Sequence, residues 1–202
     1  MSKTPWKDNG LSDEKKKKII EKHFAGIMKA LGMDMKDDSL KDTPKRVAKM
    51  YVEEIFSGLQ PSAFPKITVI ENKMRYREMV TELNITVNST CEHHFIPILG
   101  VAHVSYIPGK KVIGLSKLNR IVEYFSKRPQ VQERLTIQIA EKLKELLEIE
   151  DVAVVIDAVH TCVRTRGVKD SLSHTRTSYM SGVYNEAGSR NEFLSSVPKF
   201  EL

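Results

Sequence analysis

Val152-Ala153-Val154-Val155-Ile156-Asp157-Ala158-Val159 is a compact apolar segment that predicts a buried strand. It is a short apolar run rich in β-branched residues, which is the pattern of a strand. We expect this strand to continue into residues 160–166 and to pair with an antiparallel partner from Thr175 to Tyr184. A second strand pair is expected earlier in the chain, at Thr81 to Thr90 and Val101 to Ile107, where β-branched residues alternate or run together.

Two helices are expected between the two strand pairs. The first runs from Ser116 to about Lys127 and the second from Val131 to Leu147, with Pro129 separating them. A last short helix is expected over Ser189 to Ser196. The order of strand pair, helix pair and strand pair indicates an α+β fold, in which two helices pack on one face of an antiparallel sheet.

The N-terminal part of the chain is expected to be helical. Residues 12–31 predict an amphipathic helix, and Asp42-Thr43-Pro44 opens a second helix with Thr43 as its N-cap. Gly58 is the expected end of that helix. We therefore expect an N-terminal helical region over residues 1–65 and a second domain over residues 66–202. The apolar stripe of the first helix consists of Ile19, Ile20, Phe24, Ile27, Met28 and Leu31.

The composition indicates a soluble globular protein. The chain has 202 residues, of which 41% are hydrophobic and 29% are charged. No apolar run reaches the length of a membrane span, and the first residues lack the apolar core of a signal peptide. We expect a cytoplasmic protein with no membrane partner. A reducing cytoplasm also favours metal binding over a disulfide for the two cysteines.

The charge balance suits an anionic partner. The net charge is +6, from 32 Lys and Arg against 26 Asp and Glu. This balance permits nucleic acid but equally suits a small polyanion. The sequence contains no zinc-finger, RNA-binding or helix-turn-helix signature that would favour nucleic acid, so we expect no nucleic-acid partner.

Two half-motifs predict a metal site. Cys91-Glu92-His93-His94 and His160-Thr161-Cys162 together hold both cysteines and three of the six histidines. Thiolate and imidazole are the ligands that Zn²⁺ prefers, and three protein ligands leave a position open for water, as in catalytic sites. Either cysteine alone is more typical of core packing, but the neighbouring histidines favour a shared metal. The spacing leaves the third ligand open among His93, His94 and His160.

Basic residues at two expected helix N-termini indicate an anion site. Lys117 and Arg120 follow Ser116, the expected cap of its helix, while Lys45 and Arg46 follow Thr43. Cations there oppose the helix dipole at a cost of a few tenths of a kcal/mol each. A bound anion would reverse the sign of this interaction. One such helix is ordinary surface charge; two of them, together with Arg164 and Arg166 near the expected metal site, predict a phosphate site.

The expected strand over residues 160–166 offers more basic side chains. If it is extended, His160, Cys162, Arg164 and Arg166 point to one face. Cys162 and Arg166 would then be about 13 Å apart at ~3.3 Å per residue, comparable to the distance from a nucleotide's base to its outer phosphates. A P-loop is absent, so we expect no hydrolysis at phosphate.

Gln132-Glu133, at the start of a helix, is a candidate for binding the base of a nucleotide. A carboxylate accepts two hydrogen bonds side by side, and guanine offers a matching pair in its N1–H and 2-amino group. A favourable acid in a first helical turn is the alternative interpretation.

Four strings of sequence resemble GTP cyclohydrolase I. They cover about Asp42 to Leu194, and residues 1–41 carry little of the resemblance. They are Thr90-Cys91-Glu92-His93-His94, Gly114-Leu115-Ser116-Lys117-Leu118-Asn119-Arg120, Arg128-Pro129-Gln130-Val131-Gln132-Glu133-Arg134-Leu135 and His160-Thr161-Cys162-Val163-Arg164-Thr165-Arg166-Gly167.

The resemblance implies roles for the matching residues. It implies zinc held by Cys91, His94 and Cys162, with His93 and His160 as unligated catalytic histidines. It further implies that Glu133, with Gln132, reads the guanine. The residues implied to contact the triphosphate and ribose are Ser116, which also handles protons, Lys117, Arg120, Arg166 and Arg46.

The resemblance also implies a fold, an assembly and a reaction. The family has the tunnelling fold (T-fold) and forms a toroidal homodecamer with its sites at subunit junctions. Its reaction is the zinc-dependent conversion of GTP to 7,8-dihydroneopterin triphosphate with release of formate, the first step of pterin and folate biosynthesis. The alternative is a structural-zinc module that binds nucleic acid, which predicts a closed four-ligand site and salt-sensitive binding.

Overall fold

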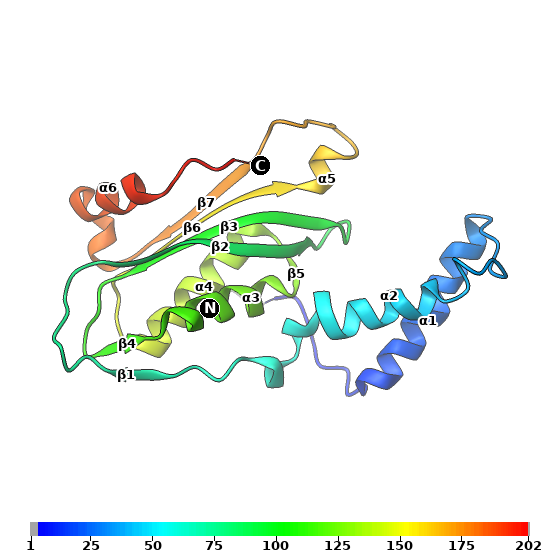
Figure 1. The fold of residues 1–202 in the computed structure, drawn as a ribbon, viewed down its shortest axis with the longest axis horizontal. Helices are drawn as coiled ribbons and strands as arrows, with labels where there is room; N and C mark the ends of the chain where they lie inside the picture. Colours follow the sequence, from blue (N-terminus) through cyan, green and yellow to red (C-terminus); the bar gives the residue numbers. More distant parts are fainter. Residues whose placement is uncertain (1–3, 202) are drawn as a thin grey trace.

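The computed structural model describes residues 4–201 and is built around a five-stranded sheet (Figure 1). Residues 1–3 of the expected N-terminal region and residue 202 of the expected second domain lie outside the described residues. The strand order is β5-β2-β3-β6-β7, antiparallel except for the short parallel pair of β2 and β5. The strands are β2 (Val80–Cys91), β3 (Pro97–Tyr106), β5 (Pro129–Gln130), β6 (Val152–His160) and β7 (Thr175–Met180). A separate antiparallel pair is formed by β1 (Val69–Glu71) and β4 (Lys111–Ile113).

Two helices cover one face of the sheet, α3 (Leu115–Ser126) and α4 (Gln132–Leu147) (Figure 1). Every residue of β6 except His160 is buried, because the sheet is covered on both faces. The main core lies between the helices and the strands. Its fully buried members include Val87, Ala102, Val104, Leu118, Ile121, Val122, Leu135, Ile139, Leu143, Val154 and Ile156.

The C-terminal part of the chain covers the opposite face. It consists of η4 (Gly182–Asn185) and α6 (Ala187–Ser196), which lie along β7 and β6 (Figure 1). Tyr184 and Phe193 are fully buried there against Ala153 and Val155. The Tyr184 hydroxyl is 2.7 Å from the Ser105 hydroxyl on β3. The buried tyrosine hydroxyl therefore has a hydrogen-bond partner.

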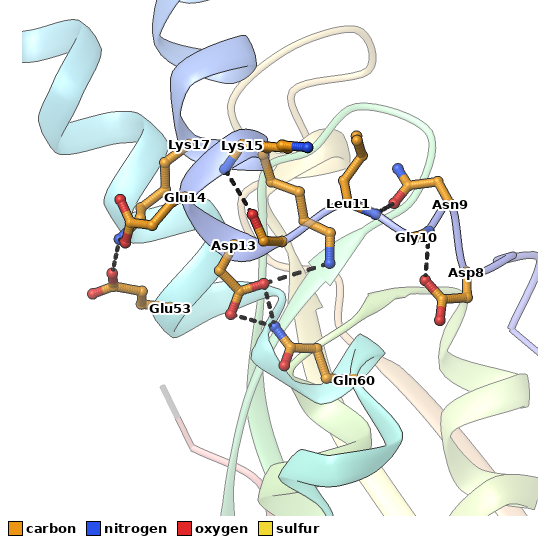
Figure 2. A network of polar contacts seen from close by, with 12 residues as sticks. Asp8, Asn9, Gly10, Leu11, Asp13, Glu14, Lys15, Lys17, Glu53 and Gln60 are labelled. Carbon is orange, nitrogen blue, oxygen red and sulfur yellow. Dashed lines mark hydrogen bonds and ion pairs between the residues drawn. The ribbon is translucent and has the colours of Figure 1, made fainter.

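The N-terminal helices extend away from the sheet (Figure 1). They are α1 (Asp13–Ala30), α2 (Thr43–Lys49) and the π-helix η1 (Met50–Ile55), followed by the short 3₁₀ turns η2 (Ser57–Leu59) and η3 (Pro61–Ala63). Figure 2 shows how the start of α1 is held: Asp13 accepts two hydrogen bonds from the Gln60 amide, and Lys17 pairs with Glu53 at 2.6 Å. Ile19, Ile27 and Leu31 of the apolar stripe remain 44%, 52% and 73% exposed.

The expected α+β arrangement and the helical N-terminal part are confirmed, with differences at element ends. β3 begins at Pro97 rather than Val101, because a short turn joins it to β2 and Thr90 pairs with Pro97. Asp42 and Gly114, rather than Thr43 and Ser116, occupy the N-cap positions of α2 and α3. The helical stretch that starts at α2 ends at Ile55, before the expected Gly58.

The expected extended strand over residues 160–166 is wrong. β6 ends at His160, and residues Thr161–Arg164 form the one-turn helix α5. Thr165 donates its backbone N–H to the Thr161 carbonyl, which continues the turn. Consequently the side chains from 160 to 166 do not share one strand face, and the ~13 Å spacing estimated for an extended chain does not apply.

Membrane-spanning helices are absent from residues 4–201, since none of the helices there combines the length and the hydrophobicity that a bilayer requires.

Candidate metal centre and substrate site

The turn between β2 and β3 carries the first half of the candidate metal site. Cys91 is the last residue of β2 and donates its N–H to the Ile96 carbonyl at 2.9 Å, while Phe95 donates to the Cys91 carbonyl at 2.9 Å. Phe95 has φ of 52°, the left-handed conformation that lets the chain turn back into β3. This single turn places Cys91 and His94 close to each other.

Sheet register brings the second half to the same place. β3 and β6 pair with Ile98 opposite His160, so the end of β6 lies beside the start of β3. The Thr161 hydroxyl donates to the Pro97 carbonyl at 2.6 Å, which anchors α5 against the turn. Cys162 therefore meets Cys91 from a one-turn helix, not from the strand that the sequence indicated.

Cys91, His94 and Cys162 form a group that can hold a metal ion. One ligand atom from each lies within 4.8 Å of the other two, and the Cys91 sulfur is 3.9 Å from His94 Nδ1. Burial raises the pKa of the Cys162 thiol, and the neighbouring Cys91 raises it further. Two thiols and an imidazole are the donors that Zn²⁺ prefers, and a cation would favour the thiolates that burial disfavours.

One of the three histidines that spacing left open lies in the group that could hold an ion. Within residues 4–201, the group close enough to bind one ion includes His94 but neither His93 nor His160. His93 Nδ1 is 3.9 Å from the Cys91 sulfur, yet its side chain is 64% exposed. His160 is turned toward α4 instead, where its Nε2 lies 2.8 Å from Gln132 Oε1.

An ion pair supports the turn that carries Cys91 and His94. Glu92 accepts hydrogen bonds from Arg134 on α4, at 2.5 Å from Nη1 and 3.3 Å from Nη2. Hydrogen bonds from Arg134 hold the pKa of the Glu92 carboxyl below its ordinary value. Sequence reasoning missed this pair, because nothing local links two residues forty-two positions apart.

Gln132 lies in the protein interior. Its side chain is 1% exposed, and its amide nitrogen is 2.9 Å from both the Ile156 and Thr175 carbonyl oxygens. Glu133, the next residue, is exposed at the first turn of α4. Burial lowers the pKa of His160, and the Glu133 charge acts in the opposite direction. The residues expected to bind the base and the expected proton-transfer histidine therefore share one corner of the site.

Arg166 lies at the same end of the molecule. Its Nη1 is 2.7 Å from His94 Nε2. An exposed guanidinium beside the metal group adds positive charge where an anionic substrate could bind.

Ser116, Lys117 and Arg120 lie away from this group. The C-terminal end of α3 is next to it, because Gln130 donates to the Phe125 carbonyl and pairs with Cys91. Ser116 precedes Phe125 by nine residues, about 14 Å along the axis at 1.5 Å per residue. Arg46 lies on α2 of the extended N-terminal part, 3.8 Å from Asp42. One chain therefore presents the expected site residues in separate places.

The chain is similar to known proteins over nearly its whole length. A family model described as GTP cyclohydrolase I matches residues 20–198. The chain is 56% identical over 195 residues to a GTP cyclohydrolase 1 from Aeromonas salmonicida, which covers 96% of this chain and 89% of that protein. It is 56% identical over 194 residues to a protein of the same name from Shewanella loihica, with 96% and 91% covered. The match begins well before Asp42, so the similarity extends further than the sequence motifs indicate.

Proposed function

Because the chain belongs to the GTP cyclohydrolase I family and is an enzyme of that family, we propose that it converts GTP to 7,8-dihydroneopterin triphosphate and formate. The observation that carries this proposal is the Cys91–His94–Cys162 group, with Glu133 and His160 beside it. The family accounts for GTP as substrate. Pterin and folate biosynthesis is the proposed pathway for the product.

Zinc is the proposed metal. Cys91, His94 and Cys162 would hold it, and their two sulfurs and one nitrogen suit zinc better than magnesium or calcium, which prefer oxygen. A zinc ion there supplies Lewis acidity, which lowers the pKa of water toward neutrality. The nucleic-acid alternative expects four protein ligands, whereas the group found among residues 4–201 has three.

His160 and Glu133 carry the first part of the proposed reaction. Glu133 accepts the N1–H and 2-amino hydrogens of guanine, with Gln132 beside it at the start of α4. His160 protonates N7 as the imidazole ring opens. A second hydrolysis releases C8 as formate. His93 and Ser116 then move protons during the rearrangement of the ribose.

Basic side chains hold the triphosphate in this proposal. Arg166 lies beside the metal group, while Lys117, Arg120 and Arg46 come from α3 and α2. Their cationic groups, and the backbone N–H groups at the start of α3, suit phosphate oxygens. The phosphates remain intact in this proposal, in keeping with basic residues but no P-loop in the sequence.

The separation between α3 and the metal group supports a site shared between subunits. Ser116 lies too far along α3 to reach the metal group of its own chain in this conformation, but a second copy could supply its α3. Exposed apolar side chains on α1 also suit an interface. We therefore propose a homo-oligomer, with the decamer as the expected form. The T-fold assignment, the domain division at residue 65 and the cytoplasmic location are parts of the same proposal.

Incubation of the purified protein with GTP tests the function. We expect formate in the solution and, after oxidation, a fluorescent pterin. Cys162→Ser should lose both the bound zinc and the activity. Binding of nucleic acid with steep salt dependence, and no formate from GTP, would instead support the structural-zinc alternative.

A further inference from the structure

The orientation of the Gln132 side-chain amide is fixed by the strands beneath it. Its Nε2 lies 2.9 Å from the Ile156 carbonyl oxygen on β6 and 2.9 Å from the Thr175 carbonyl oxygen on β7. Backbone carbonyl oxygens only accept hydrogen bonds. The amide hydrogens must therefore face the strands, since a flipped amide would place Oε1 against two acceptors in a buried position.

A pair of threonines agrees with this orientation. Thr136 donates its hydroxyl hydrogen to the Gln132 backbone carbonyl at 2.8 Å, so it can only accept from the Thr177 hydroxyl 2.7 Å away. Thr177 then donates to Thr136 and can only accept from Gln132 Nε2, at 3.2 Å. The partners of Gln132 Nε2 within residues 4–201, two backbone carbonyls and the Thr177 hydroxyl, therefore all act as acceptors.

The opposite end of the amide meets His160. Gln132 Oε1 is 2.8 Å from His160 Nε2, and an amide oxygen has no hydrogen to give. His160 Nε2 must therefore carry the hydrogen of this bond. Resting on the proposed role of His160 in proton transfer, we propose that Gln132 is a positioning residue that holds neutral His160 with Nε2 protonated, so that Nδ1 is the nitrogen that exchanges a proton with the substrate.

His160 Nδ1 is free for that task. Within residues 4–201, the His160 ring forms a hydrogen bond to Gln132 through Nε2 and none through Nδ1. Gln132 also cannot turn to the substrate without giving up its two buried hydrogen bonds to the strand carbonyls. Direct reading of guanine then falls to Glu133, and Gln132 acts through His160.

The proton balance of the first hydrolytic step follows from this arrangement. Water adds across the C8=N7 double bond of guanine, which becomes a single bond: the water oxygen bonds to C8, one O–H bond breaks and its hydrogen reaches N7, and the C8–N9 bond breaks only in the ring opening that follows. Nδ1 of His160 takes that hydrogen from the water and gives it to N7, while Nε2–H stays bonded to Gln132. The imidazole begins and ends neutral in one tautomer, so one nitrogen serves as base and then as acid without rotation of the ring.

Solid-state NMR of sedimented, zinc-loaded protein with ¹⁵N-labelled histidine tests the tautomer without substrate. The ¹⁵N shifts of a histidine report which ring nitrogen carries hydrogen, and His160→Ala assigns the signals of His160 among the six histidines. We expect Nε2 protonated and Nδ1 unprotonated. The opposite tautomer, or a mixture of both, overturns the proposal. This measurement needs no variant of Gln132.

Steady-state kinetics with GTP test the positioning role. Gln132→Met keeps the length of the side chain but removes the acceptor, so both tautomers of His160 should appear in the NMR spectrum. We expect kcat to fall by ~10–100-fold, as a displaced catalytic group does, with KM within about threefold because guanine contacts remain. A raised KM with unchanged kcat would show instead that Gln132 reads guanine, and overturns the proposal.

Thr177→Val is the matched control. It disturbs the same buried network but leaves the Gln132–His160 bond and both carbonyl bonds in place. We expect it to keep the Nε2–H form and to lower kcat far less than Gln132→Met. If wild-type protein releases no formate, the proposed function fails, whereas the tautomer of His160 still decides the hydrogen-bond assignment.

Discussion

Arg134 donates two hydrogen bonds to Glu92 and thereby joins the first turns of α4 to the loop that carries Cys91 and His94. The loop and the helix are far apart in the sequence, and the pair is largely buried, with side chains 16% and 20% exposed. α4 also carries Gln132 and Glu133. The Arg134–Glu92 pair therefore fixes the position of the metal group relative to the residues proposed to bind guanine.

Glu92→Gln should weaken metal binding. It removes the charge that Arg134 holds, and a loosened loop presents Cys91 and His94 less precisely. Changes around metal ligands of this kind cost ~10–100-fold in affinity, which zinc competition with a chromophoric chelator measures. Glu145→Gln, which alters an exposed pair with Lys142 on the same helix, is expected to leave the affinity unchanged. Equal affinities for all three proteins would contradict this role.

The same carboxylate predicts a pH dependence of stability. Arg134 lowers the pKa of Glu92 in the folded protein below its ordinary value of 4.5. A lowered folded pKa stabilises the protein above the unfolded pKa, and this contribution is lost as the pH falls through the folded pKa. The free energy of unfolding of metal-free wild type should therefore exceed that of Glu92→Gln at pH 7, and the difference should shrink below about pH 4.5. Urea denaturation across this range measures it; a constant difference argues against the assignment.

His160→Ala should separate metal binding from chemistry. His160 contacts Gln132 and is outside the metal group, so zinc content by mass spectrometry should stay at the wild-type level. Formate release should fall by ~10²–10⁴-fold, the usual contribution of a positioned acid–base group. Cys162→Ser provides the contrast, with loss of both zinc and activity. Loss of zinc from His160→Ala would make His160 a ligand.

Gly100→Ala tests the close approach of two core strands. A Cβ on Gly100 of β3 would lie 2.0 Å from the Asp157 carbonyl oxygen and 2.6 Å from the Ala158 Cα on β6. Backbone atoms cannot move aside, so the free energy of unfolding should fall by about 3 kcal/mol or more. Gly26→Ala, on α1 with no atom within 4 Å, should instead raise it by about 0.5–1 kcal/mol. A small effect of Gly100→Ala in urea denaturation would count against the register of β3 and β6.

Mixed subunits test whether a site combines two chains. Lys117→Ala should bind the triphosphate poorly and His160→Ala should lack the proton-transfer group, so each alone should be nearly inactive. After unfolding and refolding together in equal amounts, a site that takes His160 from one chain and Lys117 from another is intact in about one case in four. Recovery of activity in the mixture supports a shared site. No recovery, with mixed assemblies present, would place both residues of a site on one chain.

Local patterns predicted most of the elements because they depend on neighbours in the sequence. The apolar run from Val152 to Val159 forms most of β6, and the apolar periodicities on either side of Pro129 form α3 and α4. The ends of elements were less predictable. The expected strand beyond His160 gives way to α5, because the Thr161 hydroxyl bonds to the Pro97 carbonyl of a strand more than sixty residues earlier.

The chemical groups of the candidate site follow from the amino-acid sequence alone: two thiols, adjacent imidazoles, a carboxylate beside a glutamine and a surplus of basic residues. Folding does not change which side chains the protein has. Tertiary structure was needed to show which residue holds His160 and that Ser116 lies far from the metal group of its own chain. It also brings His94, the histidine that the family resemblance implied, close to both cysteines. Each depends on strand register and helix position, such as Ile98 opposite His160, and these come from hydrogen bonds and packing between segments that are distant in the sequence.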